Sequence, residues 1–160
     1  MGEGGLLREV MLACWAGTVA ENSSAYRETA EGIEAQLAAT LDELRDLYDN
    51  APCGYHSLDA EGRVLHINAT ELAWLGRSRD EVIGQPLARF LGPKGQAMVE
   101  WTQSRLHEQG SVSGAEFDLV GTDGSVRRVA VSGTAVKDTQ GRFVRCRTIL
   151  HDITPLRRAE

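Results

Sequence analysis

The residues that could carry chemistry in this chain are its histidines and cysteines, and they are dispersed. The four histidines form neither a Ser–His–Asp arrangement nor a metal-ligand spacing: His56, His66, His107 and His151. The three cysteines, which form no C-x-x-C pair, are Cys14, Cys53 and Cys146. Phosphate-binding G-x-x-x-x-G-K and G-x-G-x-x-G patterns do not occur in the sequence. We therefore expect no catalytic site, no metal site and reduced thiols, as in the cytosol.

Acidic side chains gather where helices are expected to begin. Glu71, Asp80 and Glu81 follow Asn68 and Ser78 at short spacing, and a carboxylate near a helix N-terminus interacts favourably with the helix dipole. We interpret these residues as helix-start acids and not as a catalytic pair.

A ligand pocket is better supported than a catalytic site, because aromatic side chains recur after residue 50. The candidates for its wall are Tyr55, His66, Trp74, Phe90, Trp101 and Phe117. Such a wall can stack on a flat ligand such as flavin or haem, or it can fill a core. With three tryptophans and three phenylalanines in the chain, core packing is favoured. Ser132 and Thr148, on predicted central strands, are the polar candidates.

Charge is distributed unevenly along a chain whose composition is that of a soluble globular protein, with 42% apolar residues. Residues 1–50 hold ten acidic and three basic side chains, whereas residues 51–160 hold thirteen and fourteen. An acidic first segment repels phosphate backbones and anionic lipid, so we expect neither nucleic acid nor a membrane as partner. The apolar run Val10–Ala20 is too short to span a bilayer. A cytoplasmic location is expected.

Residues 1–47 are predicted to be helical, because no proline precedes Pro52 and apolar residues recur at steps of four and three. This heptad seam consists of Tyr26, Ala30, Ile33, Leu37, Thr40, Leu44 and Leu47. Residues 21–24 are a possible break between this helix and a shorter one at about residues 5–20, with Ser23 or Ser24 as the N-cap of the helix that follows the break. A seam of this length requires a partner, either a second copy or the domain that follows. We expect a homodimer, parallel or antiparallel.

Strand patterns begin after Pro52. Hairpin turns are predicted at Asp59–Gly62, Asp123–Gly124 and Asp138–Gly141, each between two runs of strand-forming residues. Apolar and polar residues alternate along the later runs, which indicates a sheet with one buried face. We expect five strands, antiparallel where hairpins join them.

Helices are expected between the second and third strands. Asn68–Glu71 and Ser78–Glu81 are capping-box patterns, each followed by a helix stop at a glycine. Pro86 can begin a third short turn, and a longer amphipathic helix over residues 94–109 should end at Gly110. This order of elements predicts an α+β domain with a cavity between its helices and its sheet.

From about Leu44 to Thr154 the chain resembles the PAS sensory family. The resemblance rests on the order and spacing of DAEGRVLHINATELAWLG, SRDEVIGQPL, TDGSVRRVAVSGTAVKDTQGRFV and a closing DIT. It implies a PAS-like five-stranded antiparallel sheet with short helices on one face, here preceded by a long helical segment. It also implies an input or relay role in bacterial signalling, ahead of a histidine kinase, a cyclic-dinucleotide enzyme or a transcriptional output.

Three segments are therefore expected: a dimerisation helix over 1–47, a PAS domain over 48–154 and the start of a signalling helix over 155–160. Thr154 suits an N-cap and Pro155 a first helical position, while Asp152 can hydrogen-bond to the helix start. Asp152, Ile153 and Thr154 would thus join the last strand to the signalling helix, with the effector expected after Glu160.

The leading hypothesis is a sensory or relay module that binds a small ligand or partner and signals through paired helices. The alternatives are a ligand-free interaction scaffold and a haem- or flavin-bearing sensor. Relatives that bind flavin covalently carry an Asn-Cys-Arg motif that does not occur here. Relatives that bind haem ligate iron through a histidine on the long middle helix, where His107 lies close to the end. No cofactor is required, and its identity is left open.

Overall fold

The computed structural model describes residues 3–158 and divides the chain into two compact units, with the boundary between Arg45 and Asp46. The outer ends of the predicted first and last segments, residues 1, 2, 159 and 160, lie outside the described residues.

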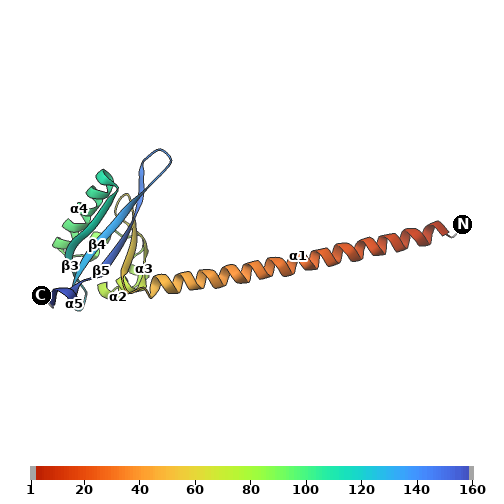
Figure 1. The fold of residues 1–160 in the computed structure, drawn as a ribbon, viewed down its shortest axis with the longest axis horizontal. Helices are drawn as coiled ribbons and strands as arrows, with labels where there is room; N and C mark the ends of the chain where they lie inside the picture. Colours follow the sequence, from red (N-terminus) through yellow and green to blue (C-terminus); the bar gives the residue numbers. More distant parts are fainter. Residues whose placement is uncertain (1–2, 159–160) are drawn as a thin grey trace. The chain divides into compact units, whose positions relative to one another are not determined.

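The first unit consists of one helix. Helix α1 (Glu3–Asp49) is continuous and is drawn in red to orange in Figure 1. The predicted break at residues 21–24 is therefore wrong. Asparagine and serine cost only a fraction of a kcal/mol each in a helix interior, and no proline interrupts the backbone hydrogen bonds. The seam residues are exposed, for example Tyr26 at 78% and Leu47 at 70%.

The second unit is built on the predicted five-stranded antiparallel sheet. Its strands are β1 (Gly54–Asp59), β2 (Val64–Ile67), β3 (Ser111–Val120), β4 (Val126–Lys137) and β5 (Phe143–Asp152), in the spatial order β2-β1-β5-β4-β3. The three predicted turns are present, with Gly62, Gly124 and Gly141 at φ of 80°, 81° and 77°. This left-handed region favours glycine, which explains why each turn carries one.

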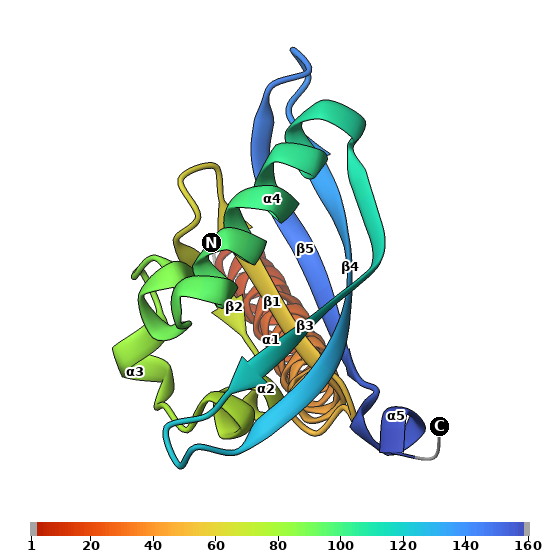
Figure 2. The same ribbon diagram turned by 90° about the vertical axis from the view of Figure 1, so that its left-hand side faces the viewer.

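Helices cover one face of this sheet. They are α2 (Ala69–Leu75), α3 (Arg79–Val82), the 3₁₀ helix η1 (Leu87–Phe90) and α4 (Pro93–Gln109), with α5 (Thr154–Arg158) after the last strand. Figure 2 shows α4 lying across the sheet. Within residues 3–158 we find no helix with the length and hydropathy needed to cross a bilayer.

Strand register decides which side chains face the helices. His56 lies opposite Thr148 and Leu58 lies opposite Cys146 across the β1–β5 pair. All four are buried, and so are Leu106 of α4 and Val131 of β4. Because successive strand residues point to opposite faces, the intervening residues of β1 and β5 face away from the helices.

Candidate functional site: the inner cavity and the exit linker

A small cavity lies between the helices and the inner face of the sheet. Its volume is about 30 Å³, which is room for about two water molecules at roughly 10–15 Å³ each. Most of its wall is apolar and includes Leu58, Leu106 and Leu150. Among the described residues, the polar side chains of the wall are His56, Glu71, Thr102, Gln103 and Thr148.

His56 and Glu71 form a buried pair in this wall. The ring Nδ1 of His56 lies 2.8 Å from Oε1 and 3.0 Å from Oε2 of Glu71, and the side chains are 7% and 2% exposed. When Glu71 is ionised, its carboxylate can only accept hydrogen bonds, and Nδ1 then donates to it. This bond fixes the ring orientation and sets which nitrogen carries the proton.

Local structure around α2 brings the pair together. Asn68 caps α2 by accepting from the Glu71 backbone N–H at 3.1 Å. The strand β1 approaches α2 closely, since a Cβ on Gly54 would lie 3.0 Å from Trp74 and 3.2 Å from Glu71. The predicted capping box at Asn68–Glu71 is therefore only half present, because the Glu71 carboxylate turns inward to His56. At α3, by contrast, Ser78 and Glu81 make both bonds of the box.

Gln103 is the unusual member of the wall. Both its amide atoms, Nε2 and Oε1, are buried and lack a hydrogen-bond partner among the described residues. Buried polar atoms normally have partners, so such an amide requires an explanation. Cys146 lines the same cavity, and burial raises the pKa of its thiol. The Cys146 thiol therefore stays protonated near neutral pH and is not an activated nucleophile.

The exit from β5 is held by a hydrogen-bonded network. Asp152 accepts from the Thr154 backbone N–H and from Arg127 Nη1, both at 2.9 Å. Thr154 Oγ1 accepts from the Arg128 backbone N–H at 2.9 Å. Burial alone would raise the pKa of Asp152, but the hydrogen bonds from Thr154 and Arg127 outweigh it and hold the pKa below its ordinary value. The carboxylate therefore stays charged where α5 begins.

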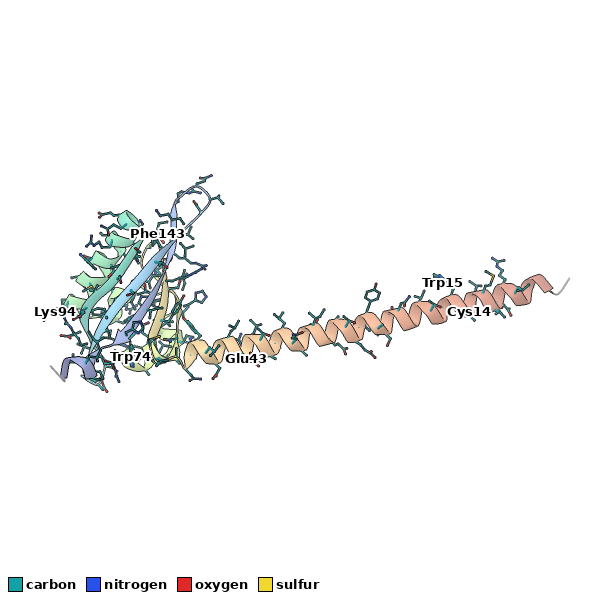
Figure 3. All side chains as sticks on the ribbon, viewed as in Figure 1. Cys14, Trp15, Glu43, Trp74, Lys94 and Phe143 are labelled. Atoms are coloured by element: carbon teal, nitrogen blue, oxygen red, sulfur yellow. The ribbon has the colours of Figure 1, made fainter. Side chains whose placement is uncertain are left out.

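Arg127 also connects this network to α2. Its guanidinium carbon lies 5.4 Å from the centre of the Trp74 ring, within the range of a cation–π contact. Trp74 lies one turn after Glu71 on the same helix, and Figure 3 shows it near the end of the domain where α5 begins. A contiguous set of contacts thus runs from the cavity wall to the exit helix.

Comparison with known families agrees with this architecture. The sequence model of the PAS domain matches residues 52–155. The chain belongs to the PAS domain family. PAS domains are sensory, non-catalytic modules of signalling proteins, so a general sensory role follows from membership, as the sequence motifs predicted.

Solved PAS domains have the same fold. The chain is 25% identical to the PAS domain of an HTR-like protein from Haloarcula marismortui, with a TM-score of 0.63, covering 77% of this chain and 99% of that one. It is also 25% identical to the PAS domain of BvgS from Bordetella pertussis, with a TM-score of 0.56 and coverage of 76% and 94%. A comparison with curated proteins found no match.

Two of the predicted pocket residues line the cavity of this PAS domain: Phe117 and Thr148. Trp74 and Phe90 are half-buried and pack against the core instead. Tyr55 and Ser132 lie on the opposite face of the sheet, since their neighbours His56 and Val131 point inward. Tyr55 packs edge-on against Tyr48 at 5.1 Å.

The other pocket candidates lie at the surface. His66 is exposed on β2, and Trp101 is 43% exposed because Thr102 and Leu106 occupy the buried stripe of α4. His107, the candidate haem ligand, is exposed and stacks on Phe143 with ring centres 4.1 Å apart, and it is not among the residues that line the cavity.

The cavity residues do not fit a large cofactor in this arrangement. A flavin or haem ring is much larger than the space for about two water molecules. Within residues 3–158, no group of three or more His, Cys, Asp or Glu side chains is placed to hold a metal ion.

Sequence reasoning missed four polar residues of the cavity wall: His56, Glu71, Thr102 and Gln103. A signal existed for His56, because it alternates with Leu58 on a strand whose other face is polar. For Glu71 the capping pattern was misleading. The spacing from Asn68 to Glu71 is the same whether the carboxylate bonds to the helix start or turns inward to the cavity. Nothing in the local pattern distinguishes Gln103 from exposed glutamines such as Gln96 on the same helix.

Proposed function

We propose that this PAS domain is a cytoplasmic sensory or relay module of a bacterial signalling protein. It responds to a small ligand or partner at the inner cavity and passes the response to the helix that follows β5. Residues 48–154 sense, residues 155–160 begin the signalling helix, and residues 1–47 pair two copies. The effector is a histidine kinase, a cyclic-dinucleotide enzyme or a regulator in the same chain.

One observation carries the proposal: Arg127 contacts both the helix that forms the cavity wall and the residue that begins the exit helix. It lies over Trp74 of α2 and 2.9 Å from Asp152. A shift of α2 would therefore change the environment of the Arg127 guanidinium and, through it, the hydrogen bond that Asp152 makes to Thr154. A ligand can exploit this only by binding one arrangement of α2 more tightly than another.

The test is to replace Asp152 and Thr154 together with alanine in the complete signalling protein. We expect the output to stop responding to the input, because α5 loses both side-chain contacts with the sheet. The fold should persist, since the substitutions lie outside the core. Asp138→Ala is the matched control, because it removes an aspartate that binds Arg142 in the β4–β5 turn. An unchanged response in the double variant would refute the linker role.

A ligand-free interaction scaffold is the second candidate, and the small size of the cavity favours it. A core that encloses only about 30 Å³ can work by contacts between proteins alone. The two candidates are separated by mass spectrometry of whatever the purified protein releases on denaturation, together with its absorption spectrum. A released small molecule favours the sensor, whereas a colourless protein that releases nothing favours the scaffold.

A further inference from the structure

The polar groups of the inner cavity point to a particular class of ligand. We propose that the cavity takes a small neutral molecule that presents a hydrogen-bond donor and an acceptor side by side, as a primary amide does. This inference rests on the proposed sensory function and adds the chemistry of the molecule that is sensed.

Gln103 carries the argument. A primary amide offers donors on its nitrogen and lone pairs on its oxygen, and in Gln103 both ends are buried without a partner in the described part of the chain. Leaving such atoms unpaired destabilises the fold. A ligand with an adjacent N–H and C=O satisfies both atoms at once by two parallel hydrogen bonds. A ligand with only one of these groups leaves the other atom unpaired.

The charges around the cavity favour a neutral ligand. Among the described residues that line it there is no lysine or arginine, so an incoming anion would find no free positive charge there. The carboxylate of Glu71 is already engaged by His56 at 2.8 and 3.0 Å, so an incoming cation would compete with an existing pair. Burying a charge without a new partner is strongly unfavourable.

The dimensions and the remaining wall set the size. A volume of about 30 Å³ is room for about two non-hydrogen atoms, so a short amide with four such atoms enters only if the cavity walls move outward. Val99, Leu106, Phe117 and Leu150 provide apolar surface around the polar groups. The ligand class is therefore a short amide or a molecule with an amide-like edge and a small apolar part.

Acetamide is a suitable probe, because acetone and acetate have the same shape and differ only in chemistry. Acetone keeps the acceptor without the donor, and acetate at neutral pH is an anion. Each probe is titrated into the 160-residue chain while the Gln103 side-chain NH₂ signals are followed by NMR. We expect saturable shifts with acetamide, and binding of acetone and acetate at least about tenfold weaker, as one lost hydrogen bond predicts.

Gln103→Leu tests the assignment to this residue. The variant should lose the saturable acetamide response, and its unfolding midpoint should rise because two unpaired buried atoms are removed. Gln96→Leu is the control, since Gln96 is exposed on the same helix and should change neither property. In the Gln103→Leu variant, cavity response is followed through the backbone amides of Thr102 and Leu106.

Three results would overturn the inference. One is an acetamide response that does not saturate, and another is a response that survives Gln103→Leu. The third is a fall in the unfolding midpoint of Gln103→Leu, which would mean that water or the fold already satisfies the amide. These failures would not affect the exit linker, which the Asp152 and Thr154 substitutions test separately.

Discussion

The buried contact between His56 and Glu71 is important for the stability of this domain. Both side chains are nearly inaccessible, and a buried ionisable group that loses its partner keeps its desolvation cost without compensation. The two residues are separated by 15 positions, and the contact joins α2 to the central strand β1. The pair therefore holds the cavity wall against the sheet.

Glu71→Met should lower the free energy of unfolding by about 3 kcal/mol, because it leaves the His56 ring buried without its acceptor. The double variant His56→Phe with Glu71→Met should recover most of this loss, since neither remaining side chain needs a hydrogen bond. Urea unfolding monitored by circular dichroism measures both. If the double variant instead lost the sum of what Glu71→Met and His56→Phe each lose in free energy of unfolding, the two residues would not be energetically coupled.

Arg142→Met serves as the control for this measurement. It breaks the ion pair with Asp138, in which the arginine side chain is 73% exposed. Exposed pairs contribute little, because water and salt screen them. We expect no clear change in the unfolding midpoint.

At the level of secondary-structure elements, Asn68 does more than an exposed N-cap residue, because its side chain holds several backbone segments as well as the start of α2. Its Oδ1 accepts from the backbone N–H groups of Tyr55 and Glu71, while its Nδ2 donates to the carbonyls of Tyr48 and Cys53. The side chain is fully buried. Asn68 thus joins the end of α1, the strand β1 and the start of α2.

Asn68→Ala should destabilise the domain by about 3 kcal/mol, since it removes a cap and leaves buried backbone groups unpaired. Ser78→Ala removes the cap of α3, where the chain is exposed, and should cost only about 1 kcal/mol. Denaturant unfolding of the two variants gives the comparison. Equal losses would mean that Asn68 acts only as a helix cap.

For the complete chain, the continuity of α1 extends the predicted seam. Because the helix does not break at residues 21–24, the steps of four and three continue upstream through Ser23, Val19 and Ala16 to Leu12. Leu12 is 58% and Val19 is 44% exposed. A helix of this length with so much exposed apolar surface is expected to pair, and a second copy is the partner that we propose.

Replacing Leu37 and Leu44 together with glutamate should convert the dimer to a monomer, because two buried like charges would face their counterparts in the seam. Sedimentation velocity measures the change in mass. The control variant, Ala35→Glu with Ala39→Glu, adds the same charge on the outer face of the helix and should remain dimeric. A dimer that survives Leu37→Glu with Leu44→Glu would place the interface elsewhere.

The local pattern of the sequence was sufficient to predict most of the secondary-structure elements and the fold class. The hairpin glycines, the caps at Asn68 and Ser78, and the alternating strands are short-range signals, because each depends on neighbours within a few positions. The family motifs then placed these elements in order. The one wrong element, the break in α1, followed from weak helix formers whose small cost the rest of the helix outweighs.

The sequence by itself therefore determined the hairpins, the helices apart from the predicted break in α1, and the PAS fold. Only the tertiary structure decided which side chains meet at the cavity. The register of β1 against β5 turns His56 inward and Tyr55 outward. The packing of α2 on β1 turns Glu71 from its cap position to His56. Such pairings depend on residues far apart in the chain, and no local periodicity encodes them.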